Sequence, residues 1–355
     1  MPLQPQPPIE LDRPTPHGAA GQAQSIKRTR FLAPLKGDLT ARQRNMIEDA
    51  LAIEQEQARA ANAIGYMIRT LAQATLPHLD PKLTQGMLYS RETGCLTLTV
   101  APTSPKYGIP YGSIPRIIMA WLCTQVVLNK EHILLDRTVR LGKSQAEFLE
   151  KLKMHNNGRD IRRFRDQSLR LFKSVISVEY TDDSEGDQSS RLLIADQSNV
   201  FWHPSKASQR SLWDSTLHLS ESFCREVIAA PVPIDMRVYH SLSKSPMAMD
   251  IYAWLTYRMF VLRRSGKPFV RIPWIGLKAQ FGASYGNGQR KADERKEIDE
   301  NQALYSFKSN FKKRFREVLN FYPEAGGHVE DTGEMLMLTP CRLHLPPRRA
   351  RKRTS

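Results

Sequence analysis

The clearest periodic pattern of apolar and polar positions lies in residues 302–322, QALYSFKSNFKKRFREVLNFY. Apolar residues recur there every three or four positions, so on an α-helix they form one stripe about 100° wide. The stripe consists of Leu304, Phe307, Phe311, Phe315, Val318 and Tyr322. The other side carries Tyr305, Ser309, Lys312, Lys313 and Arg316. The pattern predicts a helix with a core side and a basic side, which either binds a polyanion or is an ordinary solvated face.

Another basic helix is predicted earlier in the chain, at residues 159–176, RDIRRFRDQSLRLFKSVI, after the turn HNNG. Its predicted buried stripe is Ile161, Phe164, Ser168, Leu171, Phe172 and Val175. The opposite side presents Arg159, Arg162, Arg170 and Lys173, with Arg163 and Arg165 on the flanks. The chain therefore contains two helices that combine an apolar stripe with a dense row of cations.

The elements around the basic helix at residues 159–176 follow a recognisable order. An apolar helix is predicted at residues 113–128, a short strand at 133–135, and a helix after Ser144, where Glu147 completes a capping box. After the basic helix, ISVEY and RLLIAD flank an acidic turn and predict a hairpin. Helix, strand, helix, basic helix and hairpin is the order of a winged helix-turn-helix domain.

The same order recurs toward the C-terminus. SPMAMDIYAWLTYRMFVL predicts a buried helix, IPWIGLKAQFG a short second helix, residues 302–322 the basic helix, and HVEDTGEMLML a hairpin. Ala120, Trp121 and Leu122 of the first block match Ala253, Trp254 and Leu255 of the second. Four elements in the same order, together with this short match, predict two tandem domains of like architecture.

The segment before the first block predicts a helical extension. From Thr40, a candidate N-cap, there is no proline until Pro77, and apolar positions from Met46 to Leu71 alternate spacings of four and three. This heptad-like seam predicts a helix that pairs either with a second chain or with its own first domain. A short strand is predicted at residues 96–100, and a junction between the two domains near Pro231 and Pro233.

Together these elements predict an α+β chain with two tandem winged-helix domains and an N-terminal helical extension. The expected divisions are a disordered Pro/Gln-rich tail at 1–40, the helix and short strand at 41–104, winged-helix domains at 105–230 and 231–345, and a basic tail at 346–355.

Charge favours a polyanionic partner. The 355 residues include 52 Lys and Arg against 36 Asp and Glu, a formal net charge of +16. Nucleic acid leads over an anionic membrane surface, because no apolar run of about 18 residues is present. The N-terminus lacks the apolar segment of a signal peptide, so we expect a cytoplasmic protein. Cys95, Cys123, Cys224 and Cys341 are widely separated and lack C-x-x-C spacing, which favours reduced thiols over zinc ligands or disulfides.

Motifs for catalysis are missing from the sequence. LGKS at residues 141–144 resembles the end of a P-loop, but Arg137 occupies the position of the required earlier glycine. The nine histidines never occur as H-x-H or H-E-x-x-H, the metal-ligand pairs of a nickase or a protease. No Tyr is followed by Lys four residues later, which disfavours a strand-nicking tyrosine. We therefore expect no enzyme activity, no metal and no cofactor.

Several long segments resemble the RepA-type plasmid replication initiators. They are GYMIRTLAQATLPH, YGSIPRIIMAWL, FRDQSLRLFKSVIS, PVPIDMRVYHSLSKSPMAMDIYAWLTYRM and ALYSFKSNFKKRFREVLNFYP, which occur in the right order over roughly residues 60–340. The resemblance implies a cytoplasmic bacterial protein that binds the double-stranded origin of its plasmid, commonly at repeated sites. It also implies that the protein recruits the host replication initiator and the replicative helicase. A homodimer is a further expectation for initiators of this kind.

The two basic helices supply the candidate DNA contacts. Contacts to phosphates would fix the register of the protein on the duplex. Bidentate contacts from Arg, Asn or Gln to base edges would supply sequence specificity. The candidates are Arg159, Arg162, Arg163, Arg170 and Lys173 in the first helix, and Tyr305, Lys308, Ser309, Lys312, Lys313 and Arg316 in the second. A winged-helix transcriptional repressor or autoregulator shares every feature except the initiator-like segments. A rolling-circle nicking enzyme would need metal-binding histidines, and an RNA-binding protein an exposed aromatic platform.

Overall fold

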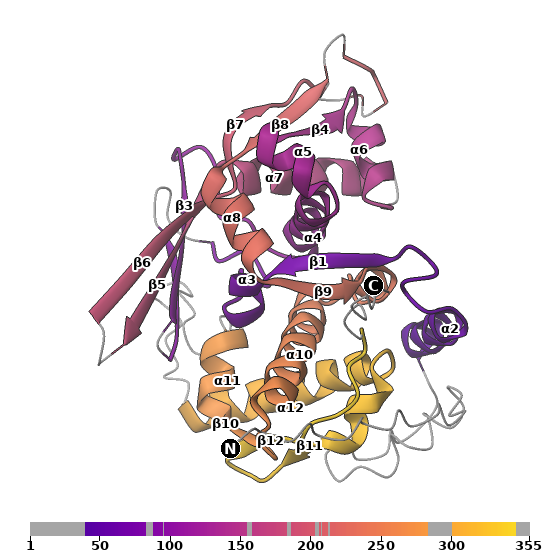
Figure 1. Ribbon diagram of the computed structural model, residues 1–355, viewed down its shortest axis with the longest axis vertical. Coiled ribbons are helices and arrows are strands. Elements are labelled where there is room, and N and C mark those ends of the chain that lie inside the picture. The colour runs from indigo at the N-terminus through magenta and orange to yellow at the C-terminus, as the bar shows by residue number, and fades with distance from the viewer. Residues whose placement is uncertain are drawn as a thin grey trace, which may run out of the picture.

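The fold is described from a computed structural model (Figure 1), which covers residues 40–82, 88–94, 96–154, 158–182, 186–202, 206, 208–211, 214–282 and 300–345. Arg159, residues 180–182 and residues 186–191 are described by their backbone alone. The predicted tails lie outside these ranges except for Thr40, and so does Cys95. Cys123, Cys224 and Cys341 are buried free thiols, as expected.

Two modules lie one above the other in Figure 1, each built around a long buried helix. The upper module contains α4 (Ser113–Leu128), α5 (Lys130–Leu135), β4 (Thr138–Gly142), α6 (Gln145–Lys151), α7 (Gly158–Phe172), β7 (Ala195–Asn199), β8 (Ser215–Leu219) and α8 (Glu221–Ala229). The lower module contains α10 (Pro246–Ser265), β10 (Val270–Pro273), α11 (Trp274–Phe281), α12 (Glu300–Leu319), the 3-10 helix η2 (Pro323–His328), β11 (Val329–Asp331) and β12 (Met335–Leu338).

The modules have matching small sheets. The strand order is β4-β8-β7 in the upper module and β10-β12-β11 in the lower one, and both sheets are antiparallel. In each, the first strand directly precedes the helix that comes before the basic helix, α6 in the upper module and α11 in the lower one. The other two strands follow the basic helix, which is α7 or α12. The predicted repetition of element order is therefore present in the structure.

The hairpin predicted from ISVEY and RLLIAD is present, but it does not belong to the small sheet of the first module. ISVEY and RLLIAD do pair, as β5 (Ser174–Asp182) and β6 (Gly186–Leu193), but in a separate sheet of order β2-β3-β5-β6. The other two strands of this sheet are β2 (Tyr89–Thr93) and β3 (Leu96–Pro102), the latter covering the predicted strand at 96–100. Alternating apolar residues on β3 and β5 are buried together, which explains the pairing. Alternation predicted the strands but could not select their neighbours.

Two boundaries near the first basic helix also differ from expectation. Residues 133–135 belong to helix α5, and the strand of this region begins later, with β4. The basic helix ends at Phe172, so Val175 lies in β5 and not on the helix stripe. The run Val175, Ile176, Val178 is rich in β-branched side chains, which favour a strand.

The single helix predicted from Met46 to Leu71 is wrong beyond its first half. Helix α2 (Ala41–Gln55) begins at Thr40 with the full capping box to Gln43, as its N-cap pattern predicted. The chain then turns and forms strand β1 (Ile64–Ile68) and the short helix α3 (Arg69–Gln73). Gly65 allows the close approach of this strand to its neighbours, since a Cβ there would overlap the Met236 side chain.

The predicted junction at Pro231 and Pro233 is itself a strand, β9 (Pro231–Asp235), followed by the short helix α9 (Met236–Ser241). It pairs antiparallel with β1, in a register that joins Ile64 to Asp235. Prolines are tolerated because β9 has a neighbour on one side only, so the missing N–H groups break no second ladder. This two-stranded pair lies between the two modules (Figure 1).

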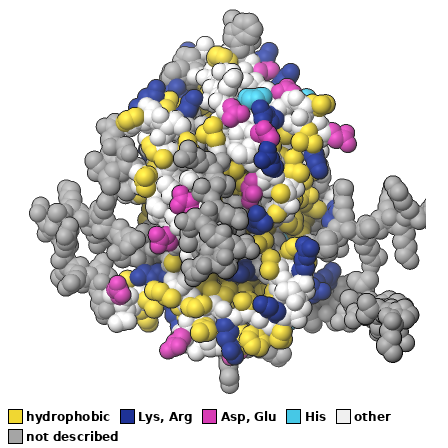
Figure 2. Space-filling view, turned by 60° about the vertical axis from the view of Figure 1, so that its left-hand side comes forward, with side chains coloured by type: hydrophobic (Ala, Val, Ile, Leu, Met, Phe, Trp, Pro, Cys, Tyr) yellow, Lys and Arg dark blue, Asp and Glu magenta, His cyan; other side chains and the backbone are white. Residues whose placement is uncertain are grey.

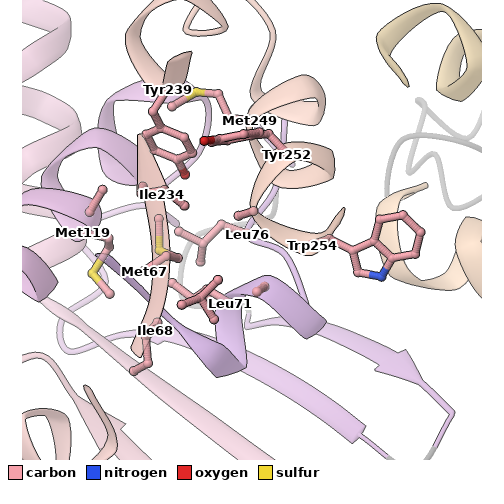
Figure 3. Packing of buried hydrophobic residues seen from close by; sticks show 14 of the residues in the cluster. Met67, Ile68, Leu71, Leu76, Met119, Ile234, Tyr239, Met249, Tyr252 and Trp254 are labelled. Atoms are coloured by element: carbon pink, nitrogen blue, oxygen red, sulfur yellow. The ribbon is translucent and has the colours of Figure 1, made fainter. Parts of the chain in front are cut away.

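One core runs through both modules and the strands between them. Figure 3 shows Met67 and Ile68 of the β1 strand near Ile234 of β9, with Tyr239 and Tyr252 beside them. A buried ion pair crosses the same region: Arg116 of α4 donates from Nε to Asp250 of α10 over 2.7 Å. His78 Nε2 donates to the other carboxylate oxygen over 2.8 Å. The modules are thus joined by apolar packing and by a shared carboxylate.

Candidate nucleic-acid interface

The inner side of α12 is as the apolar pattern predicted. Phe307, Phe311 and Phe315 are fully buried, and Leu304 is partly buried against the same core. The Phe311 ring lies edge-on to Phe281, with 5.4 Å between ring centroids, and to Trp274 at 5.6 Å. These contacts fix the rotation of α12 about its own axis and therefore decide which residues face outward.

Three candidate residues form an exposed line along α12. Tyr305 is 70% exposed, and Ser309 and Lys313 follow at intervals of four residues, both exposed. Residues four apart lie on the same face of a helix, one turn above each other. Within the described residues Lys313 forms no ion pair. An aromatic ring, a hydroxyl and an ammonium group are therefore available to a ligand at successive turns.

Lys308 and Lys312 lie beside this line and are held by Asp331, the last residue of strand β11. Lys308 Nζ lies 3.2 Å from Asp331 Oδ1, and Lys312 Nζ pairs with Oδ2. Trp274 also donates to Oδ1, from its indole Nε1 over 2.9 Å. The two ammonium groups lie over the Trp274 ring, 5.0 and 5.8 Å from its centroid. Two of the candidate cations are thus engaged within the chain.

The charge on Asp331 is stabilised by its partners. Its side chain is only 13% exposed, and this burial by itself raises the pKa of the carboxyl group. Hydrogen bonds from Lys312, Trp274, the Gly333 N–H and Lys308 outweigh burial and hold the pKa of Asp331 below its usual value. The carboxylate therefore remains ionised at neutral pH.

Arg314 and Arg316 lie at the C-terminal end of α12. Arg314 Nη1 donates to Glu317 over 2.6 Å, and Glu317 also pairs with Arg42 of α2 at 3.1 Å. The Arg314 guanidinium group is therefore engaged within its own helix. Arg316 is half-buried, and among the described residues its Nε atom has no hydrogen-bond partner. Lys313 is consequently the most accessible cation of the predicted set on α12.

Helix α7 of the upper module offers two exposed candidates, Arg162 and Arg163. Phe164 on the opposite side is fully buried, as are Ser168 and Leu171, which confirms the predicted inner stripe at these positions. Arg163 is 67% exposed and lies 3.8 Å from Asp160 in a loose surface pair. Arg159 lies in the first turn of α7, and its side chain is outside the described part.

Arg170 and Lys173 are less available. The Arg170 guanidinium pairs with Asp166, donates to the Ile109 carbonyl oxygen over 3.3 Å, and lies 5.4 Å from the Tyr111 ring centroid. Lys173 is half-buried beyond the end of α7, and its carbonyl oxygen accepts a hydrogen bond from the Thr103 N–H over 2.8 Å. Arg170 therefore ties α7 to the loop that leads into α4.

The Asp331 cluster was not predicted from the sequence. The run Asp-Thr-Gly at residues 331–333 is typical of a turn, and the Gly333 N–H does donate to Asp331 over 3.0 Å. The carboxylate nevertheless also reaches two lysines on α12, about 20 residues earlier in the chain. Helical spacing shows which lysines share a side of α12, but it says nothing about an acidic residue that reaches that side from another element.

Charge on the molecular surface is distributed over both modules. On the face seen in Figure 2, Lys and Arg side chains occur in the upper and lower parts, mixed with acidic and hydrophobic side chains. No group of His, Cys, Asp and Glu suited to a metal ion occurs among the described residues. Within the same residues, none of the helices has the length and apolar character needed to cross a membrane.

Comparisons with known proteins agree with the resemblance noted in the sequence. Residues 109–274 match the family described as "Plasmid encoded RepA protein". This segment runs from the loop before α4 to the first residue of α11, so α12 lies beyond it. No curated protein matches the chain. The predicted resemblance to the RepA-type initiators is confirmed over this segment, which is a little under half of the chain.

Two solved structures resemble the chain in fold. Both are crystal structures of domains 2 and 3 of RctB, one of them a selenomethionine derivative. Each has 12% sequence identity and a TM-score of 0.41, and the match covers 77% of this chain and 97% of the other.

Proposed function

We propose that this chain is a member of the plasmid-encoded RepA family and initiates replication by binding double-stranded origin DNA through α7 and α12. In this proposal the two modules are winged helices, with β7–β8 and β11–β12 as the wings. The basic helices would enter the major groove while the wings contact the adjacent backbone. The observation that carries the proposal is the exposed line of Tyr305, Ser309 and Lys313, directly opposite the buried phenylalanines.

The chemistry of the exposed residues suits DNA. Lys313, Arg162 and Arg163 supply charge for phosphates, which provides most of the affinity and fixes the register of the protein. Ser309 and the Arg162 and Arg163 guanidinium groups can also donate to base edges in the major groove. The net charge of +16 favours this encounter over long range.

Two modules on one chain would address one duplex at two places. Reading helices in successive major grooves on the same face are about 10 bp apart, so one chain would cover roughly 20 bp. Origin opening would draw on DNA bending and on host proteins, since the sequence shows no nucleotide-binding motif. The host initiator, the helicase and the cytoplasmic setting are taken from the family resemblance.

The test compares duplex DNA adjoining the coding region with random duplex DNA of equal length, over a range of salt concentrations. We expect tighter binding to the former, and we expect Lys313→Gln to flatten the salt dependence by about one unit of slope. Lys130→Gln on α5 is the matched control, because it removes the same charge from an exposed lysine outside both basic helices. Equal affinity for both DNAs, or equal effects of the two variants, would refute the proposal.

A further inference from the structure

The Asp331 cluster changes what the basic side of α12 can offer to DNA. Lys308 and Lys312 are four residues apart, and like charges at this spacing on a helix repel each other. The Asp331 carboxylate receives one ammonium group on each oxygen, which offsets this repulsion. The three side chains together carry one net positive charge where the sequence alone suggests two.

The cluster also fixes where that charge lies. Asp331 is anchored by the Trp274 indole and the Gly333 N–H, neither of which belongs to α12. The two ammonium groups lie over the Trp274 ring, and both lysine side chains are mostly covered, at 21% and 26% exposed. The ammonium groups are therefore held at the corner between α12 and β11 and do not sweep freely over the helix surface.

We propose that Asp331 is a positioning residue that sets the DNA specificity of the second basic helix. It restrains Lys308 and Lys312 and so weakens binding to random DNA more than binding to the target site. Binding to random DNA depends almost entirely on phosphate charge, and a mobile lysine finds a phosphate in any register. At the target site, base contacts fix the register, so lysines already in place lose little side-chain freedom on binding. This inference rests on the proposed function and adds to it.

The test is Asp331→Asn, which preserves the shape of the side chain and an oxygen for Trp274 and Gly333 but removes the charge. Its matched control is Glu330→Gln, the preceding residue of β11, which is exposed and loses the same charge. Affinities for target and random duplexes are measured against salt, with the melting temperature as a check on folding. The same substitution is also made in a Lys308→Gln/Lys312→Gln background.

We expect Asp331→Asn to bind random DNA roughly 5- to 10-fold more tightly near 0.1 M salt, the gain of about one additional phosphate contact. The slope of log K against log salt should steepen by about one, and the ratio of target to random affinity should fall. Both effects should vanish in the double-glutamine background, which a merely structural role for Asp331 would not predict.

If Asp331→Asn behaves like Glu330→Gln while the wild-type protein binds duplex DNA, the inference fails and the proposed function stands. If the wild-type protein shows no salt-dependent duplex binding, both fail. Should Asp331→Asn unfold, the lysines decide the matter. Lys308→Gln must then flatten the salt slope on random DNA by less than Lys313→Gln, because a restrained lysine reaches fewer phosphates than a free one, and an equal or larger loss overturns the inference.

Discussion

Phe311 illustrates how a single side chain orients the candidate interface. It is fully buried and meets Trp254, Trp274 and Phe281, which come from α10 and α11. The sequence pattern predicted this inner position, because a 3.6-residue period assigns sides of a helix without reference to other elements. The same reasoning placed Ser309 and Lys313 outside.

Phe311→Ala should lower the free energy of unfolding by roughly 3 to 5 kcal/mol, because it leaves a cavity among three aromatic rings. Denaturant unfolding measures this loss, and Ser309→Ala on the exposed side is the control, with a change within about 0.5 kcal/mol. Unchanged stability of Phe311→Ala together with lost DNA binding would mean that the inner and outer sides of α12 are exchanged.

His78 is a buried residue whose titration should be visible in stability. Burial is the main cause that lowers its pKa to about 4, although the hydrogen bond to Asp250 opposes this. An unfolded histidine titrates near 6.5, so between these values the unfolded chain binds the extra proton. His78 therefore contributes stability that is complete above about pH 6.5 and is lost as the pH falls toward 4.

His78→Gln should flatten this pH dependence, because the amide can donate to Asp250 and does not titrate. The quantity to compare is the difference in unfolding free energy between wild type and variant at pH 7 and pH 4.5. Taking the difference removes the other histidines from the comparison. A difference that stays constant with pH would contradict a neutral, buried His78.

At the scale of elements, α2 shows where periodicity misleads. Met46 and Ala50 are buried, and the helix packs on α9 of the same chain, while Arg42 reaches Glu317 of α12. The apolar positions beyond Gln55 continue the spacing by coincidence, since Ile64 and Met67 lie in β1, which pairs with β9, and Leu71 lies in α3. A period of three and four residues cannot be told from mixed helix and strand over so short a distance.

Removing residues 1–57 should therefore destabilise the chain without changing its oligomeric state in solution. The deletion takes away α2 and keeps β1, which a longer deletion would remove together with its pairing to β9. Analytical ultracentrifugation gives the mass, and thermal unfolding gives the stability. A fall in the number of chains per particle would instead show that α2 joins two copies of the chain.

In the upper module, the strands were predicted better than the sheets to which they belong. Sequence alternation found β5 and β6 but assigned them to the wrong sheet, because pairing across the chain depends on which buried faces meet. In the lower module the predicted hairpin is present as β11 and β12, but β10 was not predicted, and its last two residues, Ile272 and Pro273, had been assigned to the following helix. In the small sheet of the upper module, β7 has weak alternation and was not predicted for that reason.

At the scale of the whole molecule, the two modules meet through equivalent parts. Strands β1 and β9 each precede a short helix and then, later in the chain, the long central helix of a module. They pair with each other, and Arg116 of α4 shares Asp250 of α10. The relative placement of α7 and α12 thus depends on a junction with both backbone pairing and a buried ion pair.

Footprinting with hydroxyl radicals on the DNA adjoining the coding region tests the central claim most directly. With the wild-type protein, the account predicts two protected blocks on one face of the duplex, about one turn apart and together roughly 20 bp long. Arg162→Gln/Arg163→Gln should weaken one block and Lys313→Gln the other. A single block, or the same block weakened by both variants, would contradict a protein that reads DNA with two basic helices.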